Sequence, residues 1–256
     1  MDIASKVVVV TGGASGLGEA TVRRFASLGA KVAVLDINDE RGEAIADELG
    51  VGAMYARINV VDEVSVQKAL AVVIGTFGAI HVCCNFAGIS NAIKTVGKDG
   101  AFPLEDFRRV IDVNLVGTFN VLRLAAIEMA GNEADPDNGD RGVIINTASI
   151  AAYEGQMGQA AYSASKGGVV SMTLPIARDL SRYGIRVNAI VPGLIHTPMF
   201  DSLSKEVIRT LSESPLYPQR LGRPDEVAHL AQFIVENGYV NGECIRIDAG
   251  IRLQPK

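Results

Sequence analysis

The sequence has no tryptophan, and it holds only three cysteines and three histidines among its 256 residues. Cys83, Cys84 and Cys244 lie in apolar, strand-like runs, without the CxxC or Cys/His spacing of metal sites. A metal centre and a disulfide framework therefore lack the residues that they require. We expect all three cysteines to be structural thiols buried in the core.

Basic residues are not in excess either, because 24 Lys and Arg stand against 29 Asp and Glu, for a net charge of −5. Such a chain offers no basic face to phosphate backbones or anionic lipid, so we expect no nucleic-acid and no membrane partner. No basic leader followed by an apolar region begins the sequence, and no apolar run approaches the ~20 residues of a membrane span. These absences favour a cytoplasmic location in a reducing compartment.

Hydrophobic residues, by contrast, make up 48% of the chain and are accompanied by 27 glycines, a composition that suits an α/β fold. Short apolar runs rich in β-branched residues alternate with longer stretches of helical periodicity. Strands are predicted at 6–10, 31–35, 53–59, 82–85, 143–146, 186–191 and 244–247, and helices at 16–28, 41–49, 64–77, 104–129, 162–182, 205–212 and 225–235. The alternation predicts one domain over residues 1–256, a doubly wound, seven-stranded parallel sheet flanked by helices.

Three segments interrupt this alternation. Residues 91–103 follow the fourth strand, and ligands of such sheets gather at the carboxyl ends of strands, so we expect this segment to help shape a substrate site. Residues 132–141 are rich in Asp, Asn and Gly and predict a surface loop. Residues 192–218 carry four prolines around one short helix, which predicts a mobile lid over the active site.

A glycine-rich turn, TGGASGLG at 11–18, follows the first strand and runs directly into a helix. Glycines at such a turn let backbone N–H groups and the helix N-terminus approach a pyrophosphate, as in the Rossmann fold. Asp36 ends the second strand 18 residues after Gly18, where its carboxylate can accept hydrogen bonds from the adenosine ribose. That carboxylate would repel a 2′-phosphate and Ile37 supplies no cation, so NAD is favoured over NADP. The alternative is that Asp36 only caps the next helix.

Tyr162 and Lys166 stand four residues apart in a helical pattern and therefore share one face of the helix. A phenol is a poor acid or base at neutral pH, but a nearby ammonium stabilises the phenolate. Hydride transfer between a carbinol carbon and a nicotinamide needs such a group to move the proton of the oxygen. Ser149, which ends the fifth strand, can hydrogen-bond to the same oxygen. On spacing alone, a Tyr/Lys pair on a helix is usually an exposed or half-buried surface pair.

Taken together, these motifs resemble the short-chain dehydrogenase/reductase family over essentially the whole chain. The resemblance rests on the TGxxxGxG turn of Thr11, Gly12, Gly16 and Gly18, on Tyr162 and Lys166, on Ser149, on Asn114 and on Pro192-Gly193. It implies that Tyr162 is the acid/base, that Lys166 holds the nicotinamide ribose and lowers the Tyr162 pKa, and that Ser149 positions the substrate. It also implies that Asn114 fixes a helix kink that anchors a proton-relay water.

The cofactor site expected from these motifs extends beyond the glycine turn. We expect it to be formed by Gly12, Ser15, Gly16, Leu17, Gly18, Asp36, Asn59, Val60, Asn85, Ala87, Gly88, Tyr162, Lys166, Pro192, Ile195 and Thr197. Two positions depart from the family pattern. Phe86 stands where the family often has a second Asn, and Asn59 stands where it often has Asp before Val60. An Asn oxygen can still accept from the adenine amino group, without the charge.

Further runs, at 91–103, 142–149, 155–162, 172–180 and 241–252, resemble a subgroup of the family, the type II 3-hydroxyacyl-CoA (type 10 17β-hydroxysteroid) dehydrogenases. This resemblance implies oxidation of an L-3-hydroxyacyl-CoA to the 3-oxoacyl-CoA, in fatty or branched acyl-CoA oxidation, with side activity on steroids. It also implies a homotetramer formed through the helices at 104–129 and 162–182.

Candidate substrate contacts are Ser149, Tyr162, Gln156 and Gln159. The side-chain amides of the two glutamines can donate to a thioester or keto oxygen. Lys94, Lys98 and Lys205 are candidates for the CoA phosphates. The alternatives are polar surface glutamines and ordinary solvated lysines.

Two rival functions use the same motifs. In the first, the substrate is a hydroxysteroid or another secondary alcohol, held in an apolar pocket formed by Ile150, Ala151, Leu194, Ile195, Met199 and Phe200. In the second, the chain is a non-catalytic NAD sensor or scaffold, since a fold does not dictate a function. The presence of Tyr162, Lys166, Ser149 and Asn114 together argues against this second alternative.

Overall fold

The computed structural model describes residues 1–98, 100–200 and 204–255 of the chain, without the side chain of Met199. Seven strands of this part form one parallel sheet in the order β3-β2-β1-β4-β7-β8-β9. These strands are β1 (Val7–Thr11), β2 (Lys31–Asp36), β3 (Ala53–Arg57), β4 (Val82–Asn85), β7 (Gly142–Thr147), β8 (Ile185–Pro192) and β9 (Cys244–Ile247). The predicted doubly wound sheet is confirmed, with its topological switch between β1 and β4.

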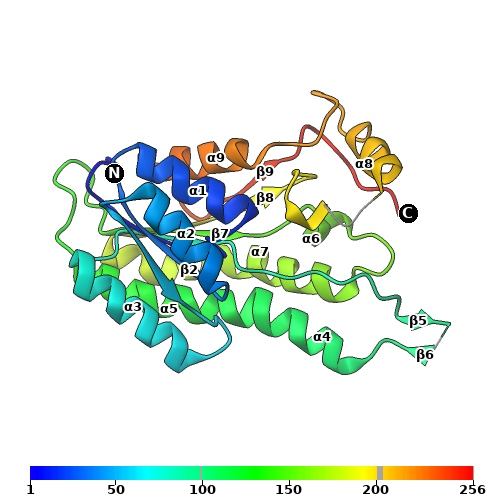
Figure 1. The fold of residues 1–256 in the computed structure, drawn as a ribbon, viewed down its shortest axis with the longest axis horizontal. Helices are drawn as coiled ribbons and strands as arrows, with labels where there is room; N and C mark the ends of the chain where they lie inside the picture. The colour runs from blue at the N-terminus through cyan, green and yellow to red at the C-terminus, as the bar shows by residue number, and fades with distance from the viewer. Residues whose placement is uncertain (99, 201–203, 256) are drawn as a thin grey trace.

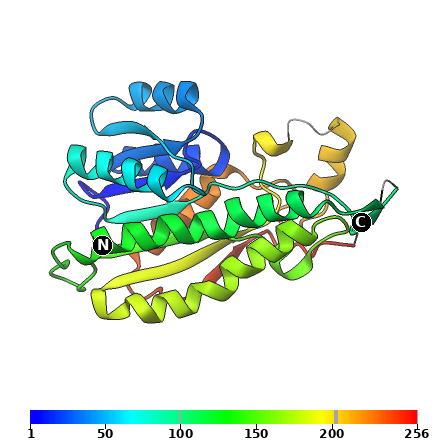
Figure 2. The same ribbon diagram turned by 90° about the horizontal axis from the view of Figure 1, so that it is seen from below.

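Helices cover both faces of the sheet (Figures 1 and 2). They are α1 (Gly16–Ser27), α2 (Asp39–Leu49), α3 (Glu63–Phe77), α4 (Leu104–Ile111), α5 (Thr118–Ala130), α6 (Ala151–Glu154), α7 (Ala160–Leu180), α8 (Lys205–Ser212) and α9 (Pro224–Glu236). One apolar core packs α3, α5 and α7 against the sheet, and the other packs α1, α2 and α9 against the opposite face. The strands are buried on both faces because helices cover both, which explains their continuous apolar runs.

The long helix predicted at 104–129 is interrupted. Its first part, α4, passes into a π-helical turn at Asp112–Gly117 before α5 begins. Over Leu104–Ala130 the helix is long and apolar enough to cross a membrane, so the expectation that no stretch approaches a span is wrong. Charged residues interrupt the apolar residues of this helix in the sequence, but the mean hydropathy of its most apolar window is still 1.5. Half of the most apolar window is buried, as in the core helix of a sheet protein.

Two small elements were not foreseen. The segment 91–103 carries a two-stranded antiparallel hairpin of β5 (Val96–Gly97) and β6 (Gly100–Ala101), and α6 follows β7 directly. Cys83 and Cys84 are fully buried, as predicted, whereas Cys244 is only half-buried because β9 lies at the edge of the sheet. Among the described residues, no group of three or more His, Cys, Asp and Glu side chains could hold a metal ion.

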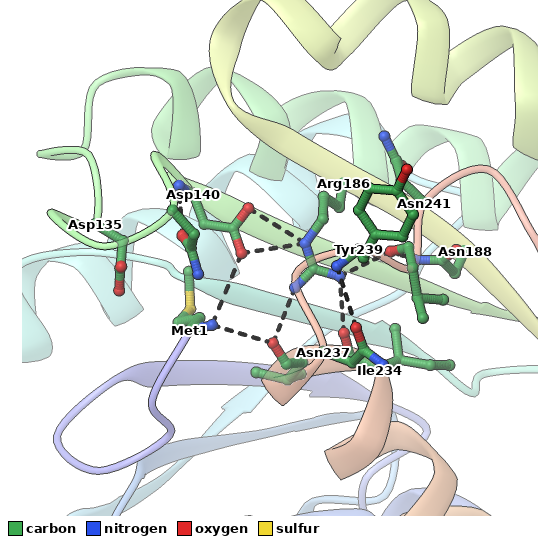
Figure 3. Close-up of polar contacts among 12 residues, drawn as sticks. Met1, Asp135, Asp140, Arg186, Asn188, Ile234, Asn237, Tyr239 and Asn241 are labelled. Carbon is green, nitrogen blue, oxygen red and sulfur yellow. Dashed lines mark hydrogen bonds and ion pairs between the residues drawn. The ribbon is translucent and has the colours of Figure 1, made fainter.

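A buried ion pair secures the edge of the sheet at the end where β8 begins (Figure 3). Arg186 on β8 donates to both carboxylate oxygens of Asp140, at 3.2 and 3.1 Å. Its guanidinium also donates to the carbonyls of Ile234 and Val235 in the last turn of α9, where a cation satisfies otherwise unpaired carbonyls. This network fixes the N-terminal end of β8 to the last turn of α9.

Candidate active site

The glycine-rich turn packs its backbone directly against the segment that follows β4. Gly12 and Gly16 have left-handed φ values of 66° and 52°. A Cβ at Gly12 would lie 2.8 Å from the Ala87 backbone nitrogen, and one at Gly18 would collide with the Gly12 carbonyl oxygen. Only glycine fits these positions. The turn therefore aims the N-terminus of α1 into the space beside β4.

Asp36, at the end of β2, holds the same turn from the other side. One carboxylate oxygen accepts from the Ala14 backbone N–H at 3.0 Å, and the other accepts from the Asn38 backbone N–H at 3.1 Å. Asn38, and not Asp36, caps α2, because its side chain accepts from the Arg41 backbone N–H. The alternative reading of Asp36 as a simple helix cap is therefore wrong.

A cavity of about 380 Å³ lies along the carboxyl ends of the strands at the switch point. Thirteen residues of the expected cofactor site line it: Gly12, Ser15, Gly16, Leu17, Gly18, Asp36, Asn59, Val60, Ala87, Gly88, Tyr162, Lys166 and Thr197. The cavity joins the glycine turn at one end to Tyr162 and Lys166 at the other. Its shape is therefore that expected for a dinucleotide bound across the switch point.

Tyr162 and Lys166 lie in the first turns of α7 and face the cavity. The Ser149 side chain lies close enough to the Tyr162 hydroxyl to influence its pKa. Ser149 Oγ accepts from the Ala151 backbone N–H at 3.1 Å. Burial raises the pKa of Tyr162 above its ordinary value, and the Ser149 hydrogen bond lowers it. The predicted meeting of Ser149 with Tyr162 is thus present in the geometry.

Lys166 is buried, and its ammonium donates to the Thr147 carbonyl oxygen at 2.7 Å. Its Nζ lies 5.8 Å from the centre of the Tyr162 ring. Burial lowers the pKa of Lys166 to about 8. The lysine is therefore held against β7, beside the Tyr162 ring and the cavity.

Asn114 is fully buried within the π-helical turn, at the kink that the resemblance implied. Its Oδ1 accepts from the Ile89 backbone N–H, and its Nδ2 donates to the Ile89 carbonyl, both at 2.8 Å. Nδ2 also donates to Ser165 Oγ at 3.0 Å. Asn114 therefore ties the segment after β4 to the helix that carries Tyr162 and Lys166.

A family model described as short chain dehydrogenase matches residues 6–208. The chain belongs to the short-chain dehydrogenase family. It is 55% identical over 251 residues to 3-hydroxyacyl-CoA dehydrogenase type-2 of Homo sapiens, which covers 97% of this chain and 96% of the relative. Its identity to the protein of the same name from Drosophila melanogaster is 51%, over 99% of this chain and 100% of the relative.

The crystal structure of 3-hydroxyacyl-CoA dehydrogenase type-2 from Mycobacterium avium superposes on this dehydrogenase with a TM-score of 0.92. The two sequences are 43% identical, and the match covers 99% of this chain and 98% of the other. Family membership makes the protein an oxidoreductase that uses a nicotinamide dinucleotide, and the non-catalytic alternative is set aside.

The residues of this dehydrogenase fit a dinucleotide. The Thr147 hydroxyl, which lines the cavity, is buried without a hydrogen-bond partner in the described structure and can pair with a polar ligand. At the other end, backbone N–H groups of the glycine turn suit a pyrophosphate, and the Asp36 carboxylate suits ribose hydroxyls. The protein's donors and acceptors along the cavity therefore match the nicotinamide, pyrophosphate and adenosine ribose parts of such a cofactor.

Three expected cofactor residues do not line the cavity. Asn85 is buried and donates to Asn146 Oδ1 at 2.9 Å, so its side chain joins β4 to β7. Pro192 ends β8, where its carbonyl accepts from the Ile150 backbone N–H. Ile195 packs into the core beside α9. Of the three, only Asn85 directly adjoins a cavity residue, Phe86, in the sequence.

The expected glutamine contacts to substrate are not supported. Gln159 Oε1 accepts from the Gln156 backbone N–H at 3.0 Å, and the Gln156 side-chain amide donates to the Gln254 carbonyl at 2.9 Å. The Gln156 amide is engaged by the end of the described chain, and neither glutamine lines the cavity beside Tyr162. Ser149 and Tyr162 remain the substrate contacts of the original set.

The residues expected to form an apolar pocket for a steroid do not line the cavity, among the side chains that the structure describes. Ile150, Ala151 and Ile195 are buried in the cores, and Leu194 and Ile195 line a separate cavity of about 160 Å³ beside Arg220. Phe200 stacks on His196. The Met199 side chain lies outside the described structure.

The sequence analysis missed several residues that line the cavity, namely Ile37, Ile58, Phe86, Ile89, Val113, Thr147 and Pro198. Most of them are apolar walls that directly adjoin predicted residues, so proximity in the sequence was the available signal. Ser165 was missed for a different reason. It lies inside the Tyr-x-x-x-Lys segment, and its role depends on Asn114, which is 51 residues away.

Proposed function

We propose that this dehydrogenase oxidises L-3-hydroxyacyl-CoA to 3-oxoacyl-CoA with NAD as the cofactor. The observation that carries the substrate assignment is the likeness, along nearly the whole chain, to relatives that bear the name 3-hydroxyacyl-CoA dehydrogenase type-2. The arrangement of Ser149 beside Tyr162, which lines the cavity, supports a secondary alcohol as the reacting group.

The chemistry of the chain itself is proton transfer. A bound nicotinamide dinucleotide supplies the hydride acceptor. The Tyr162 oxygen removes the hydroxyl proton of the substrate as the hydrogen on the carbinol carbon leaves with its bonding electrons, and the carbonyl forms. Ser149 Oγ donates to the Tyr162 oxygen and stabilises the phenolate, since that hydrogen bond lowers the Tyr162 pKa. The same hydroxyl is placed to hydrogen-bond to the substrate oxygen.

Lys166 is fixed in position as a hydrogen-bond donor toward the cofactor. Its ammonium is fixed by Thr147 O at 2.7 Å and lines the cavity, so its remaining protons are available to ribose hydroxyls. Because burial lowers the Lys166 pKa to about 8, the amine can also exchange a proton with solvent near neutral pH. Lys166 therefore orients the cofactor and can take part in returning the Tyr162 proton to water.

NAD is favoured over NADP by the charges around Asp36. The carboxylate lines the cavity where the adenosine ribose is expected, and Ile37 beside it is 63% exposed. The neighbouring cations Arg41 and Arg57 are paired with Glu19 and Asp39. A 2′-phosphate would therefore meet a carboxylate without a free cation from these two arginines.

The CoA end of the substrate is assigned to the segments that flank the cavity. Lys94, Lys98 and Lys205 are exposed on the loop after β4, on the β5–β6 hairpin and at the start of α8. In Figure 1 this hairpin and α8 lie at the same end of the molecule. Their ammonium groups suit phosphates that remain in solvent while the thioester reaches Tyr162.

The remaining expectations concern the cell and the assembly. We propose a cytoplasmic enzyme of fatty or branched acyl-CoA oxidation, without nucleic-acid or membrane partners. We also propose a homotetramer, because Val116, Phe119 and Ile127 on the interrupted helix and Leu174 on α7 are exposed apolar side chains. Sedimentation equilibrium measures this directly, and a monomer at micromolar concentration would contradict it.

The substrate is tested by steady-state assays with acetoacetyl-CoA and with a 17-ketosteroid, each with NADH and with NADPH. The proposal expects oxidation of NADH with acetoacetyl-CoA at a kcat/KM at least ~100-fold above that with the steroid. Activity with the steroid and not with acetoacetyl-CoA would contradict the proposal and support a hydroxysteroid dehydrogenase. Activity with neither substrate would leave only the oxidoreductase class.

A further inference from the structure

The segment that follows β9, residues 248–255, runs beside the loop that separates the two catalytic groups. The Gln156 side-chain amide donates to the Gln254 carbonyl at 2.9 Å, and the Met157 backbone N–H donates to the Pro255 carbonyl at 3.0 Å. Figure 1 shows the end of the described chain at the same end of the molecule as α6 and α8. We call this segment, residues 248–255, the brace.

Glu154, the last residue of α6, is the main charged contact of the brace. Its Oε1 lies 2.9 Å from Arg246 Nη1 and 3.3 Å from Arg252 Nε, and its Oε2 accepts from the Leu253 backbone N–H at 3.0 Å. These contacts hold the pKa of Glu154 below its usual range, chiefly through the hydrogen bond from Arg246. Glu154 is five residues after Ser149 and eight residues before Tyr162 in the sequence.

Arg246 completes the junction from β9. Its Nε donates to Asp248 Oδ2 at 2.7 Å, its Nη2 donates to the Ile251 carbonyl at 3.2 Å, and its guanidinium lies 5.6 Å from the Tyr153 ring centre. The side chains of Arg246, Glu154 and Asp248 are only 26%, 20% and 9% exposed. A charged network that is this well shielded is screened less than a surface pair and holds its geometry.

The brace also holds the far end of the expected lid. Ala249 has a left-handed φ of 50°, a conformation that costs energy for a residue with a Cβ. In this conformation its carbonyl accepts from the backbone N–H groups of Leu216 and Tyr217, at 3.0 and 3.2 Å. The strained turn therefore joins the end of the 192–218 segment to the same brace that contacts α6.

We propose that Glu154 and Arg246 are positioning residues, which hold α6 where Ser149 can hydrogen-bond to Tyr162. The inference rests on the proposed roles of Ser149 and Tyr162, because both residues act only through that pair. Ser149 Oγ already accepts from Ala151 at the start of α6, so a shift of this four-residue helix moves the serine directly. The brace thereby links Leu216 and Tyr217, the sheet edge and the proton-transferring group.

The test compares Glu154→Gln and Arg246→Met with the wild-type enzyme. The glutamine keeps the shape and a carbonyl for Leu253 but removes the charge that pairs with Arg246. The acidic limb of the pH profile of kcat/KM for alcohol oxidation is expected to move up by about half a pH unit or more, since the Ser149 hydrogen bond is weakened. We expect kcat to fall about 10-fold at pH 7. The Kd for NADH should stay within about twofold, because the cavity is not altered.

A second readout does not need turnover. With 13C-labelled tyrosine, the Tyr162 Cζ signal, identified by its loss in Tyr162→Phe, reports the hydrogen bond from Ser149. It is expected to shift in both variants, and Arg246→Lys should restore part of the shift because the charge is kept. This measurement separates failure of the inference from failure of the proposed substrate, since it succeeds even if no acyl-CoA is turned over.

The matched control is Asp225→Asn, which removes an ion pair of similar length, 3.0 Å to Arg24, between α9 and α1. It should change neither the pH profile nor the Tyr162 signal. Thermal unfolding and circular dichroism check that each variant is folded. If a charge variant does not fold, it is replaced by Leu253→Pro, which removes the N–H donor to Glu154 and also fixes the backbone φ at position 253. An unshifted Tyr162 signal in the folded brace variants would overturn the inference.

Discussion

The side-chain amide of Asn114 donates to Ser165 Oγ at 3.0 Å, and Ser165 Oγ in turn donates to the Tyr162 carbonyl at 2.7 Å. This chain of two hydrogen bonds links the π-helical turn to the first turn of α7. Because α7 carries the catalytic tyrosine and lysine, the position of the reacting groups depends on a residue 48 positions upstream of Tyr162. The interruption of the long helix is therefore part of the active-site architecture.

Replacing Asn114 should destabilise the fold and the site together. Asn114→Ala leaves the partly buried N–H and carbonyl of Ile89 without their partner, at a cost of about 2 kcal/mol, whereas Ser165→Ala should cost about 1 kcal/mol. In a double-mutant cycle measured by urea unfolding, the two effects should be non-additive by about 1 kcal/mol. Strict additivity would show that the Asn114–Ser165 hydrogen bond contributes nothing.

Removing the Ser149 hydroxyl should move the pH profile. The hydrogen bond from Ser149 lowers the Tyr162 pKa, so in Ser149→Ala that pKa rises and the deprotonated phenol needed for alcohol oxidation appears only at higher pH. The acidic limb of kcat/KM should therefore move to higher pH, with a fall in kcat of about 100-fold at pH 7. Ser181→Ala, an exposed serine that bonds only the Arg178 carbonyl, is the control. A limb that stays in place would remove Ser149 from this role.

Lys166→Met should stabilise the protein while abolishing turnover. Because burial lowers the Lys166 pKa from 10.5 to about 8, its charge costs about 3 kcal/mol of stability near neutral pH, offset in part by the bond to Thr147. This cost of charging Lys166 in the folded protein is complete below pH 8, decreases as the pH rises from about 8 to 10.5, and is absent above that. The variant should thus melt about 3 °C higher than wild type at pH 7, with the difference shrinking toward pH 10. A lower Tm at pH 7 would contradict this account, and differential scanning fluorimetry measures it.

Cofactor choice should follow the charge beside the ribose. Asp36→Ala with Ile37→Arg removes the carboxylate and adds a cation, so the ratio of kcat/KM for NADPH over NADH should rise by at least about 100-fold. Asp36→Ala alone also removes the acceptor of the Ala14 and Asn38 N–H groups, and should weaken NADH binding. Glu105→Gln, which alters an exposed ion pair with Arg108 on α4 but neither the cavity lining nor the arginines near Asp36, is the control. An unchanged preference would mean that Asp36 does not face the ribose.

Local pattern predicted much of this molecule. The seven strands were located within one or two residues, because parallel strands buried on both faces are continuous apolar runs. The glycines at 12, 16 and 18 were assigned correctly because their backbone requirement is visible in the sequence itself. The same holds for the Tyr162 and Lys166 pair, which the helical period alone places on one face.

Tertiary contacts determine the features of the site that local sequence patterns could not predict. Asn85 and Ile195 were assigned to the cofactor site from the family resemblance, but the Asn85 side chain bonds to Asn146 and Ile195 packs into the core beside α9. The partner of Gln156 lies 98 residues away, so no local signal could reveal that its amide is occupied. The π-helical turn likewise depends on the fit of Asn114 to Ile89 and Ser165, and not on propensity.

The measurement that tests the central claim most directly is the Tyr162→Phe variant, which keeps the ring and removes only the hydroxyl. Fluorescence titration should give a Kd for NADH within about twofold of wild type, because a single hydroxyl is lost from a large cavity. Turnover of acetoacetyl-CoA should fall by about 1,000-fold or more, since the proton donor is gone. A folded variant that retains turnover within tenfold of wild type would contradict the assignment of Tyr162 as the proton-transferring residue.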